Sequence, residues 1–337
     1  MGVAFSGHLT RVIPVEETTQ VGQVRREALG LSSLAGLGEE DAGRVALVAT
    51  ETATNVLRHG RGGRVHLSLV AGRSGLGVEV CGIDRGPGFS LARCLPDGYS
   101  TAGSAGQGLG AIKRQSTVFD VWSDAAGAVV LARVHAAAGS GGDLPYGALR
   151  IPMRHEVVCG DGWHLTWQDG QVAVTLVDGL GHGQQASEAA GLAIEAAADA
   201  GFLTAEETLV RMHARMSGSR GGAAAVFRYD PATGQGHFAG IGNISAAVHD
   251  GAGSRGLASH PGIVGAQFRR VQAFGTPVMP GNLLLMHSDG VQTRWNLAHY
   301  EGLVHRHPAL VVAVLQRDFD RGRDDTSIIA VRLGTQP

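Results

Sequence analysis

The first clear pattern of apolar and polar positions lies in residues 41–59 and predicts an amphipathic helix. Its apolar side recurs at helical spacing, at Val45, Val48, Thr52 and Val56. Glu51 and Asn55 are four residues apart, so a helix would place both side chains on one face, within reach of a common ligand.

Two strands and a glycine-rich segment follow this helix. Residues 64–71 alternate apolar and polar side chains, and residues 76–83 do so less regularly, which predicts a pair of strands. The second strand runs into Asp84-Arg85-Gly86-Pro87-Gly88, and a further cluster at residues 103–110 leads into a helix that begins near Ala111. Glycine-rich backbone before a helix N-terminus favours an anion such as phosphate, because its N–H groups are unpaired and the helix dipole is positive there. Residues 118–122 and 128–134 are expected to form closing strands.

Residues 137–144 are small, polar and without periodicity, which is typical of a linker. We therefore expect an N-terminal domain at 1–136 and a C-terminal domain at 145–337. In the second domain, Asp169-Gly170 predicts a two-residue hairpin turn. The apolar patterns there predict strands at 149–153, 162–168, 171–177, 223–229, 237–240, 245–249, 283–287 and 326–333, and helices at 184–200 and 205–217.

Aspartates stand at several of these strand boundaries. Asp178 ends an apolar run and is followed at once by Gly179 in Val-Asp-Gly-Leu-Gly-His-Gly. A single aspartate at a strand end is a turn residue by default, but four such boundaries favour a cation site. The other three present Asp161, Asp289, and Asp324 or Asp325. Carboxylates together with the backbone carbonyl of Gly179 would supply the oxygen ligands that Mg²⁺ or Mn²⁺ prefers.

Composition narrows the class of protein. The chain has 337 residues, of which 44% are hydrophobic and 17% charged, as in globular proteins with sizeable cores. A formal net charge of −2 without basic runs gives no electrostatic case for nucleic acid or an anionic membrane as a partner. The 3 cysteines have no paired spacing, and no apolar run approaches the roughly 18 residues of a membrane span. We expect a cytoplasmic protein with reduced cysteines.

The order of motifs in the first half resembles the ATP-binding family that includes gyrase, Hsp90, histidine kinases and MutL. Glu-x-x-x-Asn on a helix, Asp-x-Gly-x-Gly and Gly-x-Gly-Leu-Gly occur in that order. The run Asp97–Thr101 and the segment 108–114 look most like the small serine/threonine kinases that act as anti-sigma or switch factors. The resemblance covers about residues 10–135. It implies a Bergerat-type α/β sandwich with helices on one face of a mixed sheet.

This resemblance assigns roles to single positions. It implies that Asn55 binds Mg²⁺, that Glu51 is the general base and that Asp84 accepts the adenine amino group. The glycines and the leucine of the two clusters would allow close approach of ATP or line its triphosphate, at Gly86, Gly88, Gly106, Gly108, Leu109 and Gly110. The Gly-Thr that often precedes the last strand in the family is Gly127-Ala128 here.

The second half, about residues 147–334, resembles the 2C-type metal-dependent protein phosphatases, more closely their bacterial branch typified by the sporulation stage II phosphatase E. The match rests on Gly160-Asp161-Gly162, Val177–Gly183, Asp230–Gly234, Ile241-Gly-Asn243, Leu285–Gly290 and Asp324-Asp-Thr-Ser327. It implies an αββα sandwich and two divalent ions, bridged by Asp178, that activate a water as the nucleophile. Asp161, Gly179, Asp289 and Asp324 complete the implied ligand set, and no arginine can be assigned to the substrate phosphate.

Together the resemblances imply a partner-switching regulator of bacterial stress or sigma-factor signalling. Its phosphatase half would act on phosphoserine or phosphothreonine of a STAS-type anti-anti-sigma or stressosome protein, and its ATP-binding half would be a serine/threonine kinase. A sigma factor or another switch protein is a further implied partner, and dimers are common in both families. The alternative is an N-terminal half that senses ATP or binds an anti-sigma partner without phosphoryl transfer.

Overall fold

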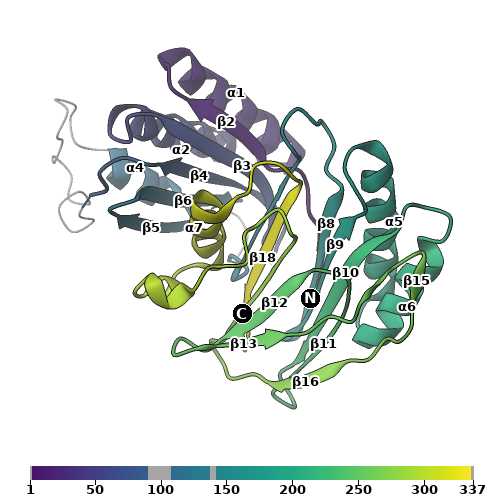
Figure 1. Ribbon diagram of the computed structural model, residues 1–337. Helices are drawn as coiled ribbons and strands as arrows, with labels where there is room; N and C mark the ends of the chain where they lie inside the picture. The colour runs from purple at the N-terminus through teal and green to yellow at the C-terminus, as the bar shows by residue number, and fades with distance from the viewer. Residues whose placement is uncertain (1, 90–107, 137–141, 335–337) are drawn as a thin grey trace. The chain divides into compact units, whose positions relative to one another are not determined.

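The computed structural model describes residues 2–89, 108–136 and 142–334 (Figure 1). The chain divides into two compact units, Thr10–Leu144 and Met1–Leu9 with Pro145–Pro337. None of the described helices is long and apolar enough to cross a membrane.

The Thr10–Leu144 unit is one sheet with a layer of helices. Its strand order is β2-β3-β4-β6-β5, and each described pair is antiparallel, so the sheet is antiparallel rather than mixed as expected. The strands are β2 (Arg11–Val15), β3 (Gly63–Ala71), β4 (Leu76–Asp84), β5 (Val118–Asp124) and β6 (Gly127–His135). The helices are α1 (Thr18–Leu34), α2 (Glu39–Arg58) and α4 (Gly108–Gln115).

The sequence of helix α2 explains which of its faces is buried and why its ends are stable. Its predicted apolar stripe is buried against the sheet, and a methyl group of Thr52 lies where a Cβ on Gly82 of β4 would have to go. Three acidic residues in the first turn and Arg58 in the last complement the helix dipole. The opposite side of the helix therefore presents Glu51 and Asn55 away from the sheet core.

The second unit contains two larger sheets and a short hairpin. The six-stranded sheet has the order β1-β8-β9-β10-β11-β16, and the five-stranded sheet has the order β13-β12-β17-β18-β7. The first is built from β1 (Val3–Ser6), β8 (Asp161–Gln168), β9 (Gln171–Gly179), β10 (Gly222–Asp230), β11 (Gln235–Ile241) and β16 (Phe274–Pro277). The second is built from β7 (Tyr146–Ile151), β12 (Ser245–His249), β13 (Ser254–Leu257), β17 (Leu283–His287) and β18 (Thr326–Arg332). The hairpin pairs β14 (Gly262–Ile263) with β15 (Gln267–Phe268).

Helices cover the outer faces of the two larger sheets. Helices α5 (Gln184–Ala200) and α6 (Ala205–Arg215) pack on the six-stranded sheet, and α7 (Pro308–Phe319) packs on β7 and β18 (Figure 1). Two 3₁₀ turns, Leu297–His299 and Leu303–His305, precede α7. The resulting αββα arrangement agrees with the fold expected from the sequence.

The start of the chain belongs to the second unit. Strand β1 pairs antiparallel with β8, and Ser6 Oγ lies 2.8 Å from His164 Nδ1. Gly7 N donates to Trp163 O at 3.0 Å, and a Cβ on Gly7 would lie 2.3 Å from the indole of Trp163. The expected N-terminal domain of 1–136 therefore includes a strand of the other unit. A four-residue strand carries too short an alternation to reveal its partner.

Most predicted elements are present with small shifts at their ends. The helix at 184–200 and the strands at 245–249 and 283–287 have the predicted bounds, and Asp169 and Gly170 both have positive φ, as the hairpin turn requires. Helix α4 is described from Gly108 onward, which lies three residues before the predicted start. Part of the predicted linker, residues 137–141, lies outside the described residues.

Candidate functional site

Two of the predicted carboxylates face each other across neighbouring strands. Asp161 is the first residue of β8, and Asp178 is its cross-strand partner near the end of β9. Asp161 is buried, and its Oδ2 accepts a hydrogen bond from Ser288 Oγ at 2.6 Å. Gly179 N donates to Gly160 O at 2.9 Å, which fixes the turn directly after Asp178.

The pKa values of these two carboxyl groups are raised. Burial, then the charge of Asp178, raises the pKa of Asp161 well above its ordinary range. Burial raises the pKa of Asp178 to about 7, and the charges of Asp289, Asp324 and Asp325 add to the increase. The carboxylates therefore lie close enough to repel one another. A bound cation would reduce this repulsion.

Asp289 and Asp324 complete the acidic group. Asp289 follows β17, and its Oδ2 accepts a hydrogen bond from Asn243 Nδ2 at 2.9 Å. Burial first, and then Asp324, raises the pKa of Asp289, whereas Arg321 lowers it. The carboxylates at these four strand boundaries are therefore close enough to influence one another.

Asp324 and Asp325 differ in what their side chains already bind. Asp325 is 3% exposed, and its two carboxylate oxygens accept backbone hydrogen bonds from Met153 N and Gly160 N, each at 2.7 Å. Asp324 is half-buried, and within the described part of the chain its Oδ1 accepts a single, local hydrogen bond, from Asp325 N at 2.9 Å. Asp325 thus ties together the segments around the site, and Asp324 is the better candidate for a ligand.

The donor chemistry of this group fits a hard divalent cation. Among the described residues, no three His, Cys, Asp or Glu side chains lie close enough together to enclose an ion by themselves. Mg²⁺ and Mn²⁺ accept sites in which water and backbone carbonyls fill the remaining positions. Burial and neighbouring carboxylates raise the pKa values of Asp161 and Asp178, and a bound cation would stabilise their charged forms.

Three of the residues predicted to bind the nucleotide, Glu51, Asn55 and Gly108, lie close together in the Thr10–Leu144 unit. A Cβ on Gly108, at the start of α4, would lie 3.1 Å from Asn55 Oδ1 and 3.3 Å from Glu51 Oε2. Any larger residue at position 108 would therefore crowd the two polar side chains of α2. Asn55 Nδ2 is buried and has no hydrogen-bond partner among the described residues, so this amide has capacity for a ligand. Leu109 and Gly110 follow in the same helix.

Asp84 lies at the end of β4, where the predicted adenine site begins. Its Oδ1 accepts hydrogen bonds from Gly86 N at 2.8 Å and from Ala128 N at 3.2 Å. The second bond is donated by the backbone N–H of residue 128. It is therefore kept although alanine stands at position 128 in place of the threonine that is common in the family. Gly88 has a φ of 67°, and a Cβ there would lie 2.3 Å from the carbonyl oxygen of Asp124. Gly106 and the run Asp97–Thr101 lie outside the described residues.

Three residues that contact or act on the acidic group were not singled out from the sequence as site residues. Ser288 links Asp161 to the five-stranded sheet, since it also accepts a hydrogen bond from Ser327 N at 3.0 Å. Asn243 holds Asp289, and Arg321 supplies the positive charge that acts on it. Ser288 and Asn243 stand inside the quoted motifs, so the signal was present, whereas Arg321 has no motif of its own.

The fold and the acidic site define a class: an ATPase-type unit joined to a unit of the metal-dependent phosphatase fold. Residues 14–134 match the family described as histidine kinase-like ATPase domain, and residues 168–334 match the stage II sporulation protein E (SpoIIE) family. The chain therefore combines a histidine kinase-like ATPase domain with a SpoIIE-type phosphatase domain.

One curated protein and several solved structures are similar to parts of this chain. The serine/threonine-protein kinase RsbT of Bacillus subtilis (strain 168) is 32% identical over 87 residues, which are 26% of this chain and 65% of RsbT. The chain thus spans just under two thirds of the length of this relative. A structure described under the bacterial stressosome, a modular system adapted to control secondary messenger signalling, has 26% identity and a TM-score of 0.52. The match covers 55% of this chain and 97% of that one.

A further structure, the PP2C phosphatase domain with a fragment of the regulatory domain of SpoIIE from Bacillus subtilis, has 13% identity and a TM-score of 0.45 over 95% of both chains. The two family matches and the RsbT relative give this chain the domain architecture of a partner-switching regulator.

Proposed function

We propose that the SpoIIE-type domain is a Mn²⁺- or Mg²⁺-dependent phosphatase for phosphoserine and phosphothreonine in proteins. The observation that carries the proposal is the group of carboxylates at four strand boundaries, in which burial and neighbouring carboxylates raise the pKa of Asp178 to about 7. The SpoIIE family match over residues 168–334 supports it.

The metal ligands in this proposal are Asp161, Asp178, Asp289 and Asp324, with the carbonyl oxygen of Gly179. When bound, two divalent ions would activate water and neutralise the phosphoryl oxygens. By the family resemblance, Asp178 would be the ligand shared by the two ions; the charges of Asp289 and Asp324 add to the increase in its pKa. Asp325 holds the backbone around the site through both of its oxygens.

Arg321 is our candidate for the residue that faces the substrate phosphate. Its side chain is exposed, its charge lowers the pKa of Asp289, and its backbone N donates to Gly290 O at 2.9 Å. A guanidinium beside the metal ligands can bind a phosphate dianion by two parallel hydrogen bonds. We expect Arg321→Ala to raise KM for a phosphopeptide more than it lowers kcat.

The phosphatase is tested by phosphate release from a phosphorylated partner with Mn²⁺, in wild type and in Asp178→Asn. We expect the variant to lose activity by at least about 10²-fold, because the bridging charge is removed. Asp169→Asn is the matched control, since it makes the same change in the hairpin turn at the other end of β9. EDTA should stop the wild type. Equal turnover by Asp178→Asn and wild type would show that the carboxylates are structural.

For the ATPase domain we propose ATP–Mg²⁺ binding and serine/threonine kinase activity. Asn55 would bind Mg²⁺ and Glu51 would act as general base, a pairing supported by their shared approach to Gly108. Glu51→Gln should bind ATP and the partner but fail to phosphorylate it. Glu39→Gln, at the other end of α2, is the control. Undiminished phosphorylation by Glu51→Gln would instead favour an ATP-sensing or anti-sigma binding module.

The proposed partner is a STAS-type anti-anti-sigma or stressosome protein, which one chain would both phosphorylate and dephosphorylate. The likeness to RsbT and to a structure from the stressosome field supports this choice. The test mixes the full chain with candidate STAS proteins, ATP and Mn²⁺, and follows the mass of the intact partner in both directions. A partner whose mass never changes is not a substrate.

A further inference from the structure

Several loops that border the acidic group are fixed to one another. A Cβ on Gly160 would lie 2.9 Å from Asp325 Oδ2 and 3.4 Å from Gly181 O. The loops before β8, after β9 and before β18 therefore meet at this glycine. Leu180 N donates to Gly221 O at 2.9 Å, which adds the loop before β10. Side chains on these loops thus have defined positions around the proposed metal ligands.

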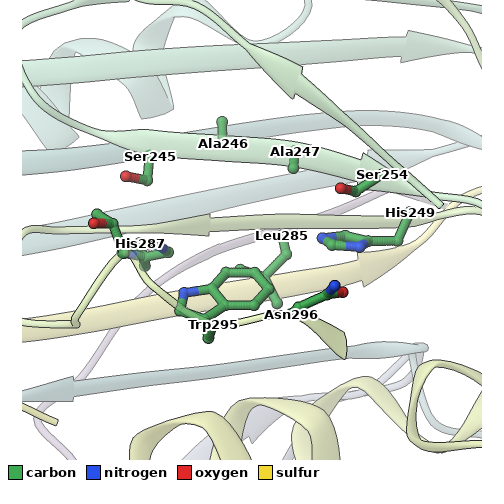
Figure 2. A pocket seen from close by; sticks show the side chains of 10 residues that line it. Ser245, Ala246, Ala247, His249, Ser254, Leu285, His287, Trp295 and Asn296 are labelled. Atoms are coloured by element: carbon green, nitrogen blue, oxygen red, sulfur yellow. The ribbon is translucent and has the colours of Figure 1, made fainter. Parts of the chain in front are cut away.

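The loop that follows Asp289 is held in place by Trp295. Figure 2 shows the indole of Trp295 between His249 of β12 and His287 of β17. Its ring centroid lies 5.8 Å from that of each histidine. His287 is the last residue of β17 and stands two positions before Asp289, so this packing ties the loop to the strand end that carries a proposed metal ligand. Arg294, next to Trp295 in the chain, is thereby held near this end of β17.

Four of these loops each carry an arginine with an exposed side chain, and we call the four residues the rim arginines. They are Arg154, Arg220, Arg294 and Arg323. A Cβ on Gly181 would lie 3.1 Å from Arg220 Nη1, so this guanidinium group lies over the loop after β9. Arg154 follows Met153, whose N–H donates to Asp325, and Arg323 directly precedes Asp324.

The positive charge of the rim arginines is not neutralised by the described part of the chain. None of the four side chains makes a hydrogen bond or salt bridge with another described residue. Two carboxylates of the same loops are engaged elsewhere: Glu156 binds His182 at 2.9 Å, and Asp320 accepts a hydrogen bond from Gln316 Nε2 at 2.9 Å. The two divalent ions proposed above would neutralise the carboxylates of the metal site. The surrounding surface then attracts anions.

The arrangement of the rim arginines favours an acidic peptide as the ligand. Because they lie on four separate loops, a ligand that contacts several of them must be extended and must carry several negative charges. A peptide with acidic residues on both sides of a phosphorylated residue meets both conditions. Surfaces for single-stranded nucleic acid combine positive charge with aromatic side chains on which bases stack. Trp295, beside Arg294, is instead packed between two histidines.

We propose that the rim arginines form a docking surface for acidic residues that flank the phosphoserine or phosphothreonine of the protein substrate. The inference rests on the proposed phosphatase function and specifies its substrate class, a phosphoprotein with Asp or Glu on both sides of the phosphorylated residue. Arg321 faces the phosphate, and the rim arginines bind the neighbouring carboxylates. Each exposed pair of an arginine and a carboxylate strengthens binding about 1.5- to 5-fold.

The test measures how tightly the full chain, with Mn²⁺, binds labelled peptides, by fluorescence anisotropy. The central residue of each peptide is a phosphonate analogue of phosphoserine, which cannot be hydrolysed, so the result does not depend on catalysis. One peptide carries two glutamates on each side of the phosphonate, and the other carries glutamines. We expect the glutamate peptide to bind at least about fivefold more tightly. This preference should shrink when NaCl is raised from about 0.05 M to about 0.5 M.

Replacing all four rim arginines by glutamine should remove the preference for the glutamate peptide, and Arg220→Gln alone should reduce it. Arg211→Gln, at an exposed position of α6, is the matched control for the single variant and should keep the preference. The proposal is overturned if wild type binds both peptides equally, or if the four substitutions leave the preference unchanged. A single-stranded oligonucleotide of the same net charge that binds as tightly as the glutamate peptide would also overturn it.

Phosphate release from the matching phosphoserine peptides, measured in parallel, separates this inference from the proposed function. Release without any preference in binding would refute the docking surface and leave the phosphatase standing. A preference in binding without release would refute the phosphatase and leave an acidic-peptide surface. Both results together, with kcat/KM higher for the glutamate peptide, are the outcome that we expect.

Discussion

Without metal, the carboxylate of Asp178 should destabilise the fold that contains it. Its pKa is about 7 in the folded chain, against an ordinary value of 3.8. Between these two pH values the folded chain binds a proton that the unfolded chain has released. Stability therefore falls as pH rises through this window and stays low above it. Replacing Asp178 by the neutral isostere Asn should remove this effect.

The magnitude follows from the two pKa values. One pKa unit corresponds to about 1.4 kcal/mol, so the increase from 3.8 to about 7 corresponds to at most about 4 kcal/mol at neutral pH. At about pH 5 the same relation gives about 2 kcal/mol, because the unfolded carboxyl group is then closer to its own pKa. Relaxation of the neighbouring aspartates reduces both values, so we expect a gain of at least about 1 kcal/mol at pH 7.5.

The assay is urea unfolding of EDTA-treated Asp178→Asn and wild type, followed by tryptophan fluorescence, at about pH 7.5 and about pH 5. Trp163, Trp167 and Trp295 report on the SpoIIE-type unit. We expect the variant to be more stable, with the larger difference at the higher pH, and Asp169→Asn to show no such pattern. A variant less stable than wild type at pH 7.5, or a difference that grows on acidification, would refute the reasoning. Added Mn²⁺ should reverse the order by stabilising the wild type alone.

Three further outcomes follow from close contacts. Gly7→Ala should destabilise the SpoIIE-type unit by about 1–3 kcal/mol, because its Cβ would overlap the Trp163 indole. The urea midpoint of that unit checks this prediction, and an unchanged midpoint would contradict it. Gly108→Val should lower ATP affinity at least about tenfold, measured by calorimetry, because it crowds Glu51 and Asn55; equal affinity would place ATP elsewhere. Asp324→Asn should weaken Mn²⁺ binding while keeping the fold. Asp325→Asn should instead lower the stability of the fold, because one carboxylate oxygen is replaced by an amide N–H donor that faces a backbone N–H.

The sequence alone determined the elements and the order of the chemical motifs. Helix α2 and the strands at 245–249 and 283–287 were predictable because a buried face imposes its period on a segment that is long enough to show it. The strand-end aspartates were recognisable for a related reason: an aspartate at the boundary of an apolar strand, such as Asp178 before Gly179, is a local pattern. Helices α1 and α7 carried no pattern that was singled out. In α7, ten of the residues are buried, so a polar face scarcely exists.

Only the tertiary structure decided which residues meet. The pairing of β1 with β8, the hydrogen bond from Ser288 to Asp161 and the charge of Arg321 beside Asp289 join segments that are far apart in the chain. The choice between Asp324 and Asp325 was likewise open in the sequence, because two adjacent aspartates look alike until their hydrogen bonds are known. Local periodicity records which face of an element is buried, but it does not record the partner across that face, and pKa values and ligand geometry depend on the partner.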